Sequence, residues 1–171
     1  GTRRKLAAAA PLRVCLSGDS ISAGANASGC TGAPPYLPFY GELVVHRLSQ
    51  RYGSPACFHN LAVGGRGAAH GVEVAAAAAA WRPDLMLVAY GMNDVGRRDP
   101  ETFRQQIAAG MEIVRTGNPD VEFVLVAPML GNPEWVHTPP EMFGRYRDAL
   151  ATLCTPEVAL ADVTRLWEDL L

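Results

Sequence analysis

Several features that would assign this chain to a specialised class are missing from its sequence. The four cysteines form no CxxC pair, which argues against a zinc or thioredoxin-type site. No apolar run approaches the roughly 20 residues of a membrane span. The net charge is −2, and the only basic cluster is Arg3-Arg4-Lys5 at the N-terminal end. A nucleic-acid surface needs a basic stripe, so we expect no nucleic-acid partner, no membrane partner and no metal.

The cysteines are explained more simply as packing residues. Cys15 and Cys57 lie in expected strands and are predicted to be small buried hydrophobes. Cys30 lies in a glycine-rich loop, where a disulfide remains an open alternative. The sequence is compatible with either the cytoplasm or secretion.

The sequence is rich in apolar residues, which make up 49% of its 171 positions, against 19% charged. One domain with a real core is therefore expected over residues 12–171, after an N-terminal extension, 1–11, whose basic end should fray. Expected strands at 12–17, 56–63, 84–90, 121–127 and 158–162 alternate with expected helices at 40–52, 68–81, 100–116, 141–153 and 165–171. This alternation predicts an α/β fold with a parallel sheet and right-handed crossovers.

One stretch, Leu12 to Ala25, organises the candidate site. Its apolar first part has the length of a buried strand and stops at Ser17-Gly18, and Ser20 follows directly. Open α/β sheets bind their ligands just past the carboxyl ends of their strands. Ser20 is therefore a candidate nucleophile, the alternative being an ordinary turn serine.

Two later strand ends are expected to meet Ser20 at the same sheet edge. One runs from Asn60 to the glycine pair Gly64-Gly65, and the other contains Asn93 and Asp94. A glycine backbone N–H can approach a substrate closely, and an asparagine amide donates without carrying a charge. A hydroxyl with donors aimed at a developing oxyanion is what acyl transfer requires.

Four blocks of the sequence resemble the SGNH, or GDSL, hydrolase family: GDSI at 18–21, NLAVGG at 60–65, GMND at 91–94 and APMLGNPEW at 127–135. The resemblance implies a flavodoxin-like three-layer α/β/α sandwich with a five-stranded parallel sheet. It implies Ser20 as the nucleophile, and the Ser20 N–H, the Gly65 N–H and the Asn93 amide as oxyanion donors. It further implies hydrolysis of esters, often of acyl groups on sugars, without a metal or organic cofactor.

The sequence departs from this family at its end. Members carry a DxxH block after the fifth strand, which supplies the acid and the base, but here Asp162 is followed three residues later by Arg165. We interpret Asp162 as the end of the strand and the domain as C-terminally incomplete, and a serine without a base is a poor catalyst. His70 and His137 are the remaining candidates for a base or a substrate contact, the alternative being solvent-exposed or capping roles. His46 and His59 are predicted to be packing or surface residues.

The other polar residues of the strand ends have structural alternatives. Asp19 is expected to bond its own turn, with a substrate contact as the alternative. Asp94 is expected to cap the turn that follows it, and Asn60 to brace its turn through backbone bonds. Trp135 either stacks on a sugar or forms an apolar lid contact.

The preferred function is a serine ester hydrolase that acts on an acylated, for example acetylated, carbohydrate or a similar small molecule. The second hypothesis is a binding protein on the same fold that lacks a base. The third is a flavodoxin-like or receiver-like module. A receiver would carry a lysine where this chain has Ala127-Pro128, and a phosphate cradle would begin a helix directly after the first strand.

Overall fold

A five-stranded sheet forms the centre of the computed structural model, which describes residues 1–170. The strand order is β2-β1-β3-β4-β5, and every pairing between neighbouring strands is parallel. This is the flavodoxin-like order, which reverses direction at β1 and β3. The strands are β1 Leu12–Gly18, β2 Ala56–Asn60, β3 Leu85–Ala89, β4 Glu122–Val126 and β5 Val158–Ala161. The predicted fold class is confirmed.

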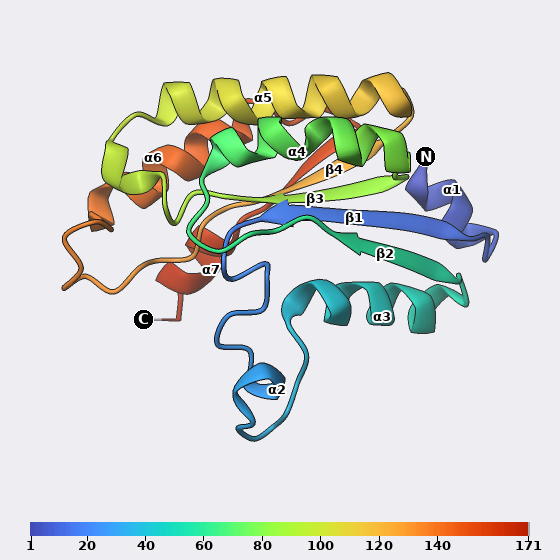
Figure 1. The fold of residues 1–171 in the computed structure, drawn as a ribbon, viewed down its shortest axis with the longest axis horizontal. Helices are drawn as coiled ribbons and strands as arrows, with labels where there is room; N and C mark the ends of the chain where they lie inside the picture. The colour runs from blue at the N-terminus through green and yellow to red at the C-terminus, as the bar shows by residue number, and fades with distance from the viewer. Residues whose placement is uncertain (171) are drawn as a thin grey trace.

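Helices lie on both sides of the sheet (Figure 1). α4 and α5 pack side by side on one face together with α6, whereas α3 lies on the other face against β1 and β2. The helices are α1 Thr2–Ala7, α2 Ser28–Thr31, α3 Tyr40–Tyr52, α4 Ala68–Trp81, α5 Pro100–Gly117, α6 Pro140–Ala151 and α7 Val163–Glu168, with a 3₁₀ turn, η1, at Val95–Arg97.

The central strand β3 is buried on both faces, as its uninterrupted apolar sequence predicts. Leu85 and Leu87 pack in the cluster on the α3 side, whereas Met86 and Val88 pack in the cluster under α4 and α5. The two-residue alternation of a strand produces this division. Packing on both faces holds β3 in place and so positions the loop after it, which carries part of the candidate site.

The α3 face is covered unevenly. Val124 and Val126 of β4 are half-buried on this side, and Ala159 of β5 is exposed. A groove over Val124 and Ala159 is bordered by Leu6 of α1 and Tyr52 of α3. Among residues 1–170, the helices on this face therefore shield β1 and β2 better than β4 and β5.

The N-terminal residues differ from the expected fraying end. They form α1, and the Thr2 N–H donates to the Glu122 carboxylate at 2.8 Å. Lys5 Nζ contacts Asp84 Oδ1 at 2.7 Å. Both partners lie far along the chain, so no local pattern could indicate that this basic segment is held.

The second strand is shorter than expected, and its cysteine is more exposed than predicted. β2 ends at Asn60, although the Leu61 and Val63 N–H groups still donate to Leu16 and Gly18 of β1. Cys15 is buried as predicted, but Cys57 is exposed because β2 is an edge strand. The burial prediction for Cys57 was therefore wrong. Cys30 is an exposed free thiol.

The close packing of α5 against α4 can be tested by replacing a glycine with alanine at the contact and, as a control, at a glycine in open space. A Cβ at Gly117 would overlap the backbone carbonyl oxygen of Ala79, whereas a Cβ at Gly144 of α6 would meet nothing within 4 Å. We expect Gly117→Ala to lower the free energy of unfolding by about 1–3 kcal/mol. Gly144→Ala should raise it by about 0.5–1 kcal/mol, because glycine is a poor helix former. Urea denaturation measures both, and equal effects would contradict the helix packing.

Candidate active site

The turn that contains Ser20, residues 19–25, begins directly after β1 and is called the Ser20 turn below. Asp19 is buried, and its Oδ1 accepts a hydrogen bond from the Ile21 N–H at 3.0 Å. The prediction that Asp19 bonds its own turn is confirmed. Ser20 itself is half-buried, and its carbonyl accepts from the Ala25 N–H at 2.9 Å.

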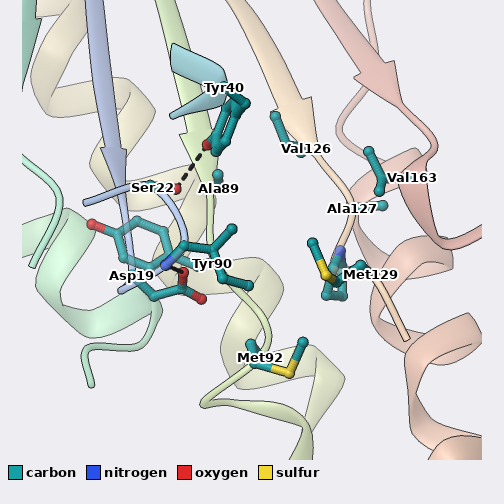
Figure 2. A pocket seen from close by; sticks show the side chains of 12 residues that line it. Asp19, Ser22, Tyr40, Ala89, Tyr90, Met92, Val126, Ala127, Met129 and Val163 are labelled. Carbon is teal, nitrogen blue, oxygen red and sulfur yellow. Dashed lines mark hydrogen bonds between the residues drawn. The ribbon is translucent and has the colours of Figure 1, made fainter. Parts of the chain in front are cut away.

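Two further side chains hold this turn in place. Ser22 Oγ and the Tyr40 hydroxyl of α3 lie 2.7 Å apart (Figure 2), and burial raises the pKa of Tyr40 to about 12. Asn60 Nδ2 donates to the Ser22 carbonyl at 2.9 Å, and Asn60 Oδ1 accepts from the Ala62 N–H at 3.0 Å. Asn60 therefore braces the turn through backbone bonds, as predicted.

The segment after β2 runs beside this turn. The Val63 N–H donates to the Gly18 carbonyl at 3.1 Å, so the backbone stays alongside β1 beyond the end of β2. A Cβ built on Gly64 would lie 3.7 Å from Ser20 Cβ. Gly65 has φ +73°, in the left-handed region that favours glycine. The glycine pair therefore lies next to Ser20, and Gly65 has a conformation that most residues avoid.

The segment after β3 meets the glycine pair from the other side. Asn93 is exposed, and its Nδ2 donates to the Arg66 carbonyl at 2.9 Å. Because a carbonyl only accepts, this bond fixes which end of the amide is nitrogen, and it leaves the second N–H of the amide free. Residues 64–66 thus contact the Ser20 turn and the Asn93 side chain, which brings the three predicted segments to one sheet edge.

Asp94 has a different partner from the one expected. Its buried carboxylate accepts from the Ala68 N–H, at 3.0 Å to Oδ1 and 3.3 Å to Oδ2. Asp94 therefore caps the start of α4 and not the turn after Asp94 itself. The prediction of a capping role was correct, but the predicted partner was wrong. Burial raises the pKa of Asp94, and the bond from Ala68 opposes that shift. Burial likewise raises the pKa of Asp19.

The histidines are distributed differently from the prediction. His70 is neither solvent-exposed nor a cap: it is 6% exposed, and its Nδ1 lies 3.0 Å from the Tyr90 hydroxyl. His59 stacks on Trp81 with the ring centres 5.4 Å apart, and His46 is exposed, as expected for packing and surface residues. His137 is exposed in the loop between β4 and α6. Within residues 1–170, no histidine is hydrogen-bonded to the Ser20 hydroxyl.

The remaining predicted residues lie around the same edge. Trp135, in the β4–α6 loop, is 59% exposed. Asp162 ends β5 and caps α7 by accepting from the Arg165 N–H at 3.0 Å, and it pairs with Arg147 at 3.2 Å. This agrees with the interpretation of Asp162 as the strand end.

A cavity of about 280 Å³ lies on the α3 side of the Ser20 turn (Figure 2). Asp19, Ser22 and Tyr40 line one wall, and Met129 and Val163 lie on the opposite side. Asp19 belongs to both the turn and the cavity, whereas Ser20, Gly65 and Asn93 do not line it. The cavity is thus a neighbour of the three converging segments and not their meeting point.

Sequence reasoning missed the contacts of Tyr40, His70 and Tyr90 in this region. Tyr90 looks like the last residue of an apolar strand, and His70 lies in an alanine-rich helix. The His70–Tyr90 bond joins residues 20 positions apart. No spacing rule within one element predicts such a bond.

A comparison with known families decides the class of protein. The sequence profile described as the GDSL-like lipase/acylhydrolase family matches residues 16–170. The chain belongs to this family. It is therefore a carboxylic ester hydrolase, and the resemblance found in the four sequence blocks is confirmed.

Solved structures share the fold of this GDSL-like chain. The lipase Lip_vut3 from a goat rumen metagenome is 11% identical with a TM-score of 0.74, covering 92% of this chain and 83% of that one. TesA is 23% identical with a TM-score of 0.65, covering 86% and 76%. A two-domain esterase active on acetylated mannans is 19% identical with a TM-score of 0.65, covering 98% of this chain and 50% of that one. At such identities the likeness establishes the fold alone.

No curated protein matches the GDSL-like chain. Every helix in the described part of the chain is too short or too polar to span a bilayer.

Proposed function

We propose that Ser20 is the nucleophile of an ester hydrolase that proceeds through an acyl-enzyme. The observation that supports this role is the convergence of the three segments: Gly64 lies beside Ser20, and the Arg66 carbonyl accepts from Asn93. The segments that carry the hydroxyl, the glycine pair and the neutral amide then lie side by side at one edge of the sheet. Family membership gives the reaction class, and this convergence supports the choice of residues.

The proposed reaction uses each group at a definite step. Ser20 Oγ gives its proton to a base and attacks the ester carbonyl carbon, and the carbonyl oxygen becomes an oxyanion. The N–H groups of Ser20 and Gly65 and the free N–H of the Asn93 amide donate to that oxyanion. The alcohol leaves with a proton, and water then cleaves the acyl-Ser20 ester to the acid.

The base needs a separate source. A serine hydroxyl is a weak nucleophile without one, and none of the described histidines is bonded to Ser20. The family resemblance assigns the base to the histidine of a DxxH block, and we propose that a histidine of this kind accepts the Ser20 proton. Without that histidine, residues 1–170 would bind an ester and turn it over poorly, which is the second candidate function.

The proposed substrate is an acetyl ester on a carbohydrate or on a similar small alcohol. Trp135 presents a 59% exposed ring in the β4–α6 loop, and exposed His137 lies two residues further on. An aromatic face with a polar neighbour suits a sugar, which has apolar ring faces and hydroxyl edges. One solved structure of the same fold is an esterase active on acetylated mannans, which supports this choice. Asp19, on the cavity wall, is a further proposed contact.

The substrate proposal is tested by kinetics on the full-length protein with acetylated manno-oligosaccharides and 4-nitrophenyl acetate. We expect Trp135→Ala to raise KM for the sugar ester about 10-fold, the loss of one stacking contact. KM for 4-nitrophenyl acetate should change less than twofold. Trp167→Ala, which removes another exposed tryptophan from α7, is the matched control and should leave both values unchanged. Equal KM values for wild type and Trp135→Ala on the sugar ester would overturn the carbohydrate assignment and leave the ester hydrolase assignment intact.

A further inference from the structure

The two segments that carry the proposed oxyanion donors are joined by a buried contact behind the site. Gly65 lies three positions before the start of α4, and His70 lies in the first turn of that helix. Tyr90 is the first residue after β3, three positions before Asn93. His70 Nδ1 and the Tyr90 hydroxyl lie 3.0 Å apart, and their rings meet edge to face with centres 6.3 Å apart. The pair therefore links the helix that follows one donor to the strand that precedes the other.

This contact is protected from water, as is the bond from the Ala68 N–H to the Asp94 carboxylate, whereas the bond between Asn93 and Arg66 is exposed. His70 and Tyr90 are 6% and 2% exposed, whereas Asn93, which bonds Arg66, is exposed. An exposed hydrogen bond exchanges readily with water and contributes little net stability, but a buried one is costly to break because both groups lose their partner. The His70–Tyr90 bond is therefore better suited than the Asn93–Arg66 bond to hold the two segments at a fixed separation.

The absence of a side chain at Gly71 makes room for the Tyr90 ring of this pair. A Cβ at Gly71 would lie 3.0 Å from Cε2 of the Tyr90 ring, so glycine leaves the room that the ring occupies. Burial lowers the pKa of His70 and raises the pKa of Tyr90 to about 12. Both groups are then neutral at pH 7, and the hydrogen bond joins them without a buried charge.

We propose that His70 and Tyr90 are positioning residues for the oxyanion hole, acting as a buried brace between the segments 64–67 and 90–94. The inference rests on the proposed roles of Gly65 and Asn93. Donors stabilise a transition state only when they are already in place, and a displacement of about 1 Å can cost about 100-fold in rate. Removing the brace leaves both donors and the Asp94–Ala68 bond in place, and it loosens one of the two buried links that set the separation of the segments.

The test compares Tyr90→Phe, which removes only the hydroxyl, with wild type in the full-length protein on 4-nitrophenyl acetate. We expect kcat to fall about 10-fold, which is less than the roughly 100-fold loss for a 1 Å displacement of a donor, while KM stays within twofold of the wild-type value. His70→Leu should give the same loss, and the double variant should lose no more than either single one, because all three break the same bond. His70→Asn, whose amide occupies the position of Nδ1, should restore kcat to within about threefold of wild type.

A matched control separates positioning from stability alone. Ser54→Ala also removes a buried hydroxyl bond, from Ser54 to the Ala10 carbonyl, near the start of β1 at the other end of the sheet. It should lower Tm by a few degrees, as Tyr90→Phe should, and leave kcat unchanged. If Tyr90→Phe lowers Tm and leaves kcat at the wild-type value, the pair is only structural and the proposal is overturned. If wild type itself hydrolyses no ester, the proposed function fails first and this inference fails with it.

Discussion

Replacing Ser20 with alanine should lower kcat for 4-nitrophenyl acetate by about 10⁴-fold or more, with little change in stability. Loss of the nucleophile removes the covalent step, and only the donors and substrate binding remain to accelerate the reaction. Ser20 is half-buried, and its hydroxyl makes no hydrogen bond to another described residue, so the alanine variant loses no folding contact. Steady-state kinetics and urea denaturation of the same preparation measure both parts of the expectation.

A fluorophosphonate reagent identifies the attacked residue directly. The reagent should modify Ser20 in wild type and leave the Ser20→Ala protein unlabelled, as read by mass spectrometry of the peptides. Ser22→Ala is the matched control because it removes the other serine of the same turn, and it should retain the label on Ser20. Hydrolysis that persists in Ser20→Ala would exclude Ser20 as the nucleophile.

The second large effect is expected at Asn93. Asn93→Ala removes the only proposed side-chain donor to the oxyanion and should lower kcat by about 10²–10³-fold. KM should change little, because the donor acts on charge that develops only in the transition state. The Asn93 amide is exposed and, among residues 1–170, bonds only the Arg66 carbonyl, so the free energy of unfolding should change by less than about 1 kcal/mol.

Asn118 provides a matched control for this variant. Its Nδ2 also donates to a backbone carbonyl, that of Pro83 at 2.8 Å, near the start of β3 at the other edge of the sheet. Asn118→Ala should leave kcat unchanged while it weakens the fold slightly. A loss of folding in Asn93→Ala larger than that in Asn118→Ala would mark Asn93 as a structural residue.

Much of the fold could be predicted because the relevant signals are local. Helices α3 and α4 have the predicted bounds, since Gly53 and the Arg82-Pro83 pair end them. The alternation of strands and helices was enough for a parallel sheet. The convergence of Ser20, the glycine pair and Asn93 follows from the same topology, because the carboxyl ends of neighbouring parallel strands meet at one edge.

The parts that sequence reasoning missed depend on partners far along the chain. Asp94 caps a helix 26 residues before it, and Lys5 pairs with an aspartate 79 residues after it. The exposure of Cys57 depends on β2 being the last strand of the sheet, which the apolar sequence of β2 does not reveal. Each case needs the positions of two elements, and a pattern within one element carries no such information.

The glycine pair beside Ser20 offers an opportunity for engineering. Gly65 needs φ +73°, so a side chain there would strain the backbone. Gly64 has no such requirement, and a Cβ there would make an ordinary 3.7 Å contact with Ser20 Cβ. A library of side chains at position 64 could therefore change the space beside Ser20 without straining the backbone of the loop.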